Sequence, residues 1–205
     1  MTRIIGGSAG GRRLQTPPGD ATRPTTDRVR EALFSSIEAW CGSIGGLGGI
    51  RFLDLYAGSG AIGLEALSRG AETATLVESD RRTAALIGTN ARTLGLAADV
   101  RAASVRTTLG APPELPYDVV FSDPPYPLSE EPLAEDLAQL QGWLAPDALV
   151  VVERSRRSPE PSWPPLIEGC RAKRYGETTL WYGRADLPDE ATTSDAGPTS
   201  PQETR

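Results

Sequence analysis

The stretch Phe52-Leu53-Asp54-Leu55-Tyr56-Ala57-Gly58-Ser59-Gly60-Ala61-Ile62-Gly63 joins an apolar run to a glycine-rich loop. The apolar run at residues 52–56 predicts a buried strand, and a helix through Leu67 is predicted after the loop. The segment from Gly58 onward has the spacing G-x-G-x-x-G, and Glu78 lies 20 residues after Gly58. Such glycines let the backbone approach a nucleotide-like ligand, and the later acid binds ribose hydroxyls. The stretch therefore predicts a strand–loop–helix unit that binds an adenosine-containing cofactor.

The same alternation of strand and helix continues along the chain. Further strands are predicted at 75–78, 100–103, 118–121 and 149–152, with helices over about 80–94 and 133–140. Apolar strands that alternate with helices indicate a mostly parallel sheet covered on both faces. Two segments on either side of Gly176, Arg171–Tyr175 and Thr178–Tyr182, predict a terminal antiparallel hairpin. The predicted fold class is α/β and Rossmann-like.

The remaining segments set the expected domain organisation. Residues 1–41 form an arm, hairpin-like or extended, followed by a helix that begins after Thr25 or Thr26. A glycine-rich connector spans 42–49, the core domain 50–185, and an acidic tail 186–205, whose composition cannot bury a core.

Composition excludes several classes of protein. The chain has no histidine, so the commonest general base and metal ligand are missing, and no metal is expected. Its two cysteines make neither a disulfide framework nor a zinc motif. No apolar run approaches a membrane span, and the N-terminus lacks a secretion signal, so we expect a cytoplasmic protein. The net charge is −6, but the first thirty residues are rich in arginine, which is compatible with contacts to nucleic-acid phosphates or with an ordinary solvated surface.

Asp54 decides between two kinds of cofactor. A pyrophosphate binder presents an uncharged helix N-terminus to its ligand, whereas a carboxylate just before the loop opposes phosphate. Asp54 suits S-adenosylmethionine, whose ammonium and sulfonium are both positive; the alternative is a structural Asp that caps the turn. The predicted cofactor-binding residues lie at the ends of four strands: Asp54, Tyr56, Ala57, Gly58, Ser59, Gly60, Glu78, Ser79, Asp80, Ser104, Val105 and Asp123.

A second motif, Asp123-Pro124-Pro125-Tyr126, directly follows the fourth predicted strand. Two prolines fix the backbone and remove two N–H donors, so carbonyl acceptors face the site. An exocyclic base amine needs such acceptors, because its lone pair is delocalised into the ring. We expect Asp123 and the Pro124 carbonyl to hold the amine, and Tyr126 to stack on the base. The alternative is a proline-rich turn that merely ends a strand.

Three further segments carry a resemblance to a known family. They are Arg3-Ile4-Ile5-Gly6-Gly7, Arg23-Pro24-Thr25-Thr26-Asp27-Arg28-Val29-Arg30-Glu31-Ala32-Leu33-Phe34 and Arg174-Tyr175-Gly176-Glu177-Thr178. With the two motifs above, they resemble the bacterial small-subunit rRNA guanine-N2 methyltransferases, the RsmD family, over roughly residues 3–183. The resemblance implies a class I S-adenosylmethionine-dependent methyltransferase with a seven-stranded sheet. It also implies N2 methylation of a guanine in 16S rRNA, on the small ribosomal subunit or an assembly intermediate.

On this interpretation, arginines at both ends of the domain bind RNA. The expected RNA-binding residues are Arg3, Arg12, Arg13, Arg23, Arg28, Arg30, Arg154, Arg156 and Arg157. Thr25, Asp27 and Arg30 either fold over the cofactor or pin the arm to the core, and the sequence leaves both open. The rival functions are a DNA or other RNA base amino-methyltransferase, with adenine N6 or cytosine N4 as target, and a catalytically silent rRNA-binding assembly factor.

Overall fold

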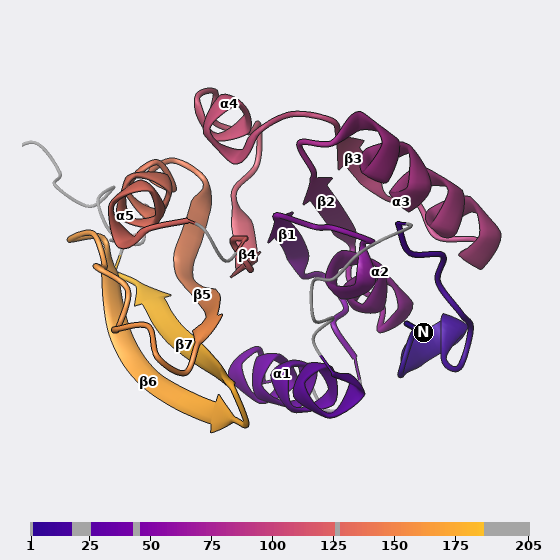
Figure 1. The fold of residues 1–205 in the computed structure, drawn as a ribbon, viewed down its shortest axis with the longest axis horizontal. Helices are drawn as coiled ribbons and strands as arrows, with labels where there is room; N and C mark the ends of the chain where they lie inside the picture. Colours follow the sequence, from indigo (N-terminus) through magenta and orange to yellow (C-terminus); the bar gives the residue numbers. More distant parts are fainter. Residues whose placement is uncertain (1, 18–25, 43–45, 126–127, 187–205) are drawn as a thin grey trace, which may run out of the picture.

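The computed structural model describes residues 2–17, 26–42, 46–125 and 128–186. Seven strands form one sheet in the order β3-β2-β1-β4-β5-β7-β6 (Figure 1). The strands are β1 (Arg51–Leu55), β2 (Thr73–Val77), β3 (Asp99–Arg101), β4 (Tyr117–Ser122), β5 (Leu144–Ser155), β6 (Ile167–Tyr175) and β7 (Thr178–Ala185). β1 to β5 run parallel, whereas β7 is antiparallel to both β5 and β6. This confirms the predicted α/β fold with a terminal antiparallel hairpin.

Helices cover both faces of the sheet, as Figure 1 shows. The helices are α1 (Asp27–Trp40), α2 (Ala61–Ser68), α3 (Arg81–Leu94), α4 (Val105–Leu109) and α5 (Glu130–Ala138), with a 3-10 turn η1 (Gly7–Ala9). Strand side chains alternate between the two layers: Phe52 packs with α1, α2 and α3, whereas Leu53 packs with α4 and α5. Both faces are therefore apolar, which explains the uninterrupted hydrophobic runs in the sequence.

Local chemistry explains where α1 begins and why α4 was missed. The Thr26 Oγ1 caps α1 by accepting a hydrogen bond from the Val29 N–H at 3.4 Å. This resolves the choice between Thr25 and Thr26. α4 is absent from the predicted elements, because its five residues are too few to show a helical period. β5 is also longer than predicted and begins at Leu144.

The N-terminal arm docks on α2. Arg3 and Arg13 pair as an antiparallel bridge, in keeping with the expected hairpin. The buried Glu65 carboxylate accepts hydrogen bonds from the Ile5 and Gly6 N–H groups at 2.6 and 2.8 Å. Charged acceptors make strong hydrogen bonds, so Glu65 fixes the arm against the core.

The predicted domain limits stay predictions. α1 packs in the same apolar cluster as α2 and α3. Residues 43–45 of the connector and the tail beyond residue 186 lie outside the described residues. Within the described part of the chain, no helix has the length and apolar character needed to cross a membrane.

Replacing Gly7 by alanine should undock the arm. Gly7 has φ +74°, and a Cβ there would lie 1.8 Å from the Ser68 carbonyl oxygen. The clash is between the backbone of Gly7 and the backbone of Ser68, and neither can move without disturbing its own segment. We therefore expect a loss of about 2–3 kcal/mol in unfolding free energy. Gly11→Ala is the matched control: its φ is +80°, but no atom lies within 4 Å of the added Cβ. Urea unfolding checks the pair, and equal losses for the two variants would contradict the close packing argued for Gly7.

Candidate active site

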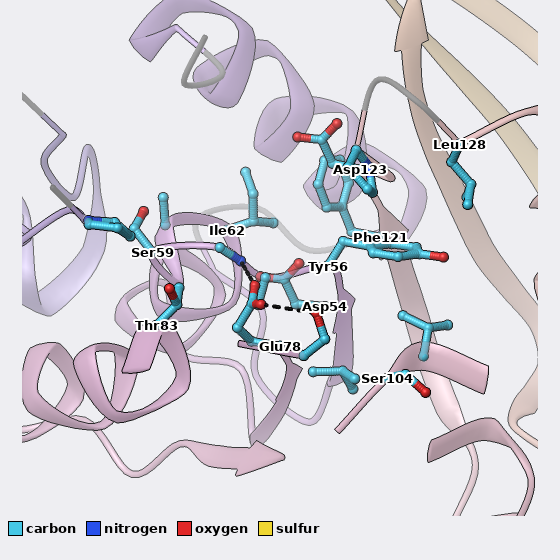
Figure 2. Close-up of a pocket in the computed structure, with 18 of the residues that line it drawn as sticks. Asp54, Tyr56, Ser59, Ile62, Glu78, Thr83, Ser104, Phe121, Asp123 and Leu128 are labelled. Carbon is cyan, nitrogen blue, oxygen red and sulfur yellow. Dashed lines mark hydrogen bonds between the residues drawn. The ribbon is translucent and has the colours of Figure 1, made fainter. Parts of the chain in front are cut away.

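A cavity of about 800 Å³ opens at the carboxyl edge of the sheet. β1 lies between β2 and β4, so the strand order changes direction there, and open α/β sheets bind ligands at such a point. Figure 2 shows Asp54, Glu78 and Asp123 converging on this cavity from the ends of three strands. Its volume lies within the range of about 300–1,000 Å³ typical of small-molecule sites.

The glycine loop after β1 has the conformation that its sequence predicts. Tyr56, Gly58 and Gly60 have φ of 63°, 54° and 82°. A Cβ on Gly58 would meet no atom within 4 Å, whereas one on Gly60 would lie 2.9 Å from Ile87. Gly58 therefore leaves space on the cavity side, and Gly60 permits close packing against α3. Gly60 does not itself line the cavity.

Glu78, just after β2, holds the loop in place. One carboxylate oxygen accepts a hydrogen bond from the Gly58 N–H at 3.0 Å, and the other accepts one from the Asp80 N–H at 2.8 Å. The side chain also lines the cavity beside Ser79. Glu78 is thus placed both to shape the loop and to bind hydroxyl groups of a ligand.

Asp54, at the end of β1, is both a structural and a cavity residue. Its Oδ2 accepts a hydrogen bond from the Gly63 N–H at 2.8 Å, which ties β1 to α2. Burial raises the pKa of Asp54 to about 7; the Gly63 hydrogen bond lowers it, and the nearby Glu78 charge raises it. The structural interpretation of Asp54 is thus seen in the hydrogen bond to Gly63, and its role toward the cofactor stays a prediction that its place in the cavity lining permits.

Asp123 and Pro125 line the same cavity from the end of β4. Burial raises the pKa of Asp123 well above its usual range, the charges of Glu153 and Asp54 raise it further, and Arg154 opposes them. The Pro125 carbonyl already accepts a hydrogen bond from the Leu128 N–H at 2.8 Å. Pro124 is buried behind this turn, and Tyr126 lies outside the described residues, so its stacking role stays a prediction.

Three predicted cofactor residues have local roles in the structure. Asp80 caps α3 by accepting a hydrogen bond from the Thr83 N–H at 2.8 Å, and it does not line the cavity. Ser104 lines the cavity but caps α4 through the Thr107 N–H at 3.1 Å. Tyr56 lines the cavity and donates its hydroxyl hydrogen to Asp136 on α5. The sequence analysis missed Asp136, which becomes a neighbour only through the fold.

Comparison with known proteins places the chain in a family. The family model described as Conserved hypothetical protein 95 matches residues 2–184. The chain is 41% identical to Ribosomal RNA small subunit methyltransferase D of Escherichia coli, over 85% of each chain, and 37% identical to the protein of the same name from Haemophilus influenzae, over 77% of this chain and 80% of that one. The chain belongs to this RsmD family. The solved structure of Escherichia coli yhhF matches with a TM-score of 0.78 at 35% identity, covering 91% of this chain and 99% of that one.

Membership of the RsmD family confirms two predictions, the resemblance itself and a methyltransferase as the class of enzyme. Four acidic residues line the cavity: Asp54, Glu78, Asp123 and Asp136. Among the described residues, no cluster of side chains could hold a metal ion.

Three of the arginines predicted to bind RNA make contacts within the protein. Arg30 and Arg154 have side chains only 1% and 7% exposed, and they pair with Asp27 and Glu130. The Arg12 guanidinium donates to the carbonyl oxygens of Leu94 and Thr93 at the end of α3. Arg30 and Arg154 are therefore buried in internal contacts and are not available to RNA at the surface, whereas Arg12 is exposed and its RNA-binding role stays a prediction. Arg3, Arg13, Arg28, Arg156 and Arg157 are exposed, although Arg3 pairs with Asp27, and Arg23 lies outside the described residues.

The arm also reaches the cavity, which the sequence left undecided. Thr2, Thr16, Pro17 and Arg30 line it together with the glycine loop. The Asn90 amide on α3 donates to the carbonyl oxygens of Gln15 and Ser59, at 3.0 and 3.2 Å, and so joins the arm to the loop. Arg30 pins the arm through the Arg3 carbonyl oxygen and also lines the cavity, Asp27 does not line it, and Thr25 lies outside the described residues, so a role of these residues over the cofactor stays a prediction.

We expect Glu78→Ala to weaken cofactor binding by about 10- to 100-fold, because it removes charged acceptors for ligand hydroxyls and frees the loop. Calorimetric titration with S-adenosylhomocysteine checks this. Glu72→Ala, at an exposed position before β2, is the control. Wild-type affinity in Glu78→Ala would remove Glu78 from the site.

Proposed function

We propose that this protein transfers a methyl group from S-adenosylmethionine to the exocyclic N2 amine of a guanine in 16S rRNA. The observation that carries the proposal is that the glycine loop and two residues of the second motif, Asp123 and Pro125, line one cavity. The rRNA substrate is taken from the names of relatives that are 41% and 37% identical. The choice of guanine N2 rests on the arginine-rich N-terminal motif.

The residues of the cavity fit this cofactor. Gly58 leaves open space on the loop, and Glu78 offers carboxylate oxygens suited to ribose hydroxyls. Asp54 supplies negative charge for a ligand whose amino-acid end carries an ammonium beside a sulfonium. When bound, the cofactor supplies an electrophilic methyl group.

The residues after β4 act on the amine. Asp123 accepts a hydrogen bond from one amine N–H, and the Pro124 carbonyl accepts the other, so the nitrogen lone pair is turned toward the cofactor. The raised pKa of Asp123 makes its carboxylate a better proton acceptor than an ordinary one. Asp123 or water then takes the surplus proton. Much of the rate comes from holding two reactants in line.

Arg156 and Arg157 extend the site toward RNA. β5 runs parallel to β4 with Ser122 opposite Val152, so the residues after Ser155 lie at the same edge of the sheet as Asp123. Both side chains are exposed. We assign them to phosphates that flank the target nucleotide, with Arg3, Arg13 and Arg28 on the arm and α1.

Parallel assays distinguish this function from its rivals. Labelled methyl transfer is measured on small ribosomal subunits, free 16S rRNA, tRNA and DNA, followed by nucleoside analysis. We expect N2-methylguanosine in 16S rRNA, from subunits or assembly intermediates. N6-methyladenine or N4-methylcytosine would favour another base amino-methyltransferase, and tight RNA binding without transfer would favour a silent assembly factor.

Replacing Arg156 and Arg157 together by glutamine should weaken rRNA binding and flatten its salt dependence. Each lost phosphate contact reduces the slope of log K against log salt by about 0.7–0.9. The control is Arg92→Gln: Arg92 lies in the last turn of α3, at the opposite edge of the sheet, because α3 runs back from the carboxyl edge. A slope unchanged from wild type in the double variant would exclude the assigned phosphate contacts.

A further inference from the structure

Arg30 carries a buried charge that the protein itself only partly satisfies. The side chain projects from α1 and is 1% exposed. Its Nη2 donates to the Arg3 carbonyl oxygen and to Asp27 Oδ1, each at 2.7 Å. Nε and Nη1 are buried, and neither has a hydrogen-bond partner among the described residues. Buried donors without acceptors are costly, so these two groups need a further acceptor, which a ligand in the cavity lined by Arg30 can supply.

The charge around Arg30 is also unbalanced. Asp27 is shared, because its second oxygen accepts a hydrogen bond from Arg3 Nε at 2.9 Å. Two guanidinium groups and one carboxylate leave a net charge of +1 in this cluster. A buried cation without a full counter-ion favours an anionic ligand.

Arg30 differs from the other charged residues of the cavity. Asp54, Glu78, Asp123 and Asp136 also line it, and all are acidic. The other basic residue in the lining, Arg106, has a side chain 62% exposed and pairs with Glu135. Among the described residues, Arg30 is therefore the one buried cation that lines an otherwise acidic cavity.

We propose that Arg30 binds the carboxylate of the methionine part of S-adenosylmethionine. The inference rests on the proposed function, which supplies the cofactor. That end of the cofactor is a zwitterion: the ammonium suits the acidic groups, whereas the carboxylate is repelled by them and needs a cation. Arg30 and the glycine loop line one cavity, and the Asn90 bridge between Gln15 and Ser59 sets the arm against that loop.

Asp27 is a positioning residue for Arg30. It fixes Nη2 while leaving Nε and Nη1 unoccupied. Because Asp27 also holds Arg3 on the arm, the arm supports the cofactor site through this shared carboxylate.

The test compares two ligands that differ by the carboxylate alone, S-adenosylmethionine and its decarboxylated form. Affinities are measured by calorimetry on wild type and on Arg30→Met, with Arg92→Met, an exposed arginine in the last turn of α3 that is assigned to neither site, as the control. We expect wild type to prefer the intact cofactor by about 10- to 100-fold, the range of a charge-assisted hydrogen-bonding pair. Arg30→Met should abolish the preference and leave the affinity for the decarboxylated form within about twofold, since that ligand never made the contact.

Several outcomes would overturn the inference. One is the absence of any preference in wild type, and another is an equal loss of affinity for both ligands in Arg30→Met, which would make Arg30 structural. Loss of rRNA binding with both ligand affinities unchanged would assign Arg30 to an RNA phosphate instead. If Arg30→Met does not fold, as judged by thermal unfolding, Arg30→Lys and Arg30→Gln replace it, and the preference should rank wild type above lysine and lysine above glutamine. If wild type prefers the intact cofactor over its decarboxylated form but does not transfer methyl to rRNA, the proposed function is refuted and the role of Arg30 in cofactor binding still holds.

Discussion

Asp123→Ala is expected to lower methyl transfer to rRNA by about 10²–10⁴-fold, the contribution typical of a positioned acid–base group. Asp123 lies at the end of β4 in the cavity that holds the glycine loop, and the variant removes both an acceptor for the amine and a base for its proton. The affinity for S-adenosylhomocysteine should change little, because Glu78 and the loop remain. Single-turnover transfer and calorimetry separate the two effects. Wild-type turnover in Asp123→Ala would refute the proposed mechanism.

The pH dependence of transfer gives the Asp123 role a second test. Burial, with the charges of Glu153 and Asp54, raises the pKa of this carboxyl. Only the ionised form accepts the amine proton, so kcat/KM should fall as the pH falls through a value well above that of an ordinary carboxyl group. Asp123→Asn keeps an acceptor oxygen but cannot ionise, so this acid limb should disappear along with most of the rate. If the pH profile of kcat/KM for Asp123→Asn kept its acid limb at the same pH, the limb would belong to another titratable group.

Asp54→Asn should stabilise the ligand-free protein at high pH. The pKa of Asp54 is raised from 3.8 to about 7 in the folded state, so ionisation opposes folding. The protonated carboxyl therefore contributes stability that is fully present below pH 4 and is lost as the pH rises through 7. At about 1.4 kcal/mol per pKa unit, the variant gains up to roughly 4 kcal/mol over wild type at pH 8 and little at pH 4. Asparagine can still accept the Gly63 N–H hydrogen bond.

The same variant should bind the cofactor more weakly. It removes the negative charge that faces the positive end of S-adenosylmethionine, a loss of about tenfold or more. The neutral 5′-methylthioadenosine lacks that end and should keep its affinity. Urea unfolding at the two pH values and calorimetry with the two ligands test both effects, with the exposed Glu114→Gln as control for net charge. A stability difference independent of pH would contradict the raised pKa of Asp54.

The motifs that end strands were predictable because their chemistry is local. The loop from Asp54 to Gly60 needs positive φ at glycines, and apolar runs of strand length indicate a sheet buried on both faces. Parallel strands then bring Glu78 and Asp123 to one edge without knowledge of any contact. The helix cap at Thr26 follows from the same kind of local rule.

Pairings between distant residues were not predictable in this way. Arg12, Arg30 and Arg154 all seemed available to RNA in the sequence, yet each donates a hydrogen bond to a group in another segment of the chain. Tyr56 and Asp136 are 80 residues apart and meet only because α5 packs beside the end of β1. Charge composition gives no sign of which arginine becomes buried.

The amino-acid sequence was enough for the fold class, the strand-end motifs of the site and the family, because local backbone conformation and the alternation of strands with helices depend on short-range patterns. The strand order and the cavity that the glycine loop shares with Arg30 and the N-terminal arm became visible in the folded chain alone. A hydrogen bond or an ion pair depends on distances between side chains, and the packing of α1 and the arm against the core sets those distances.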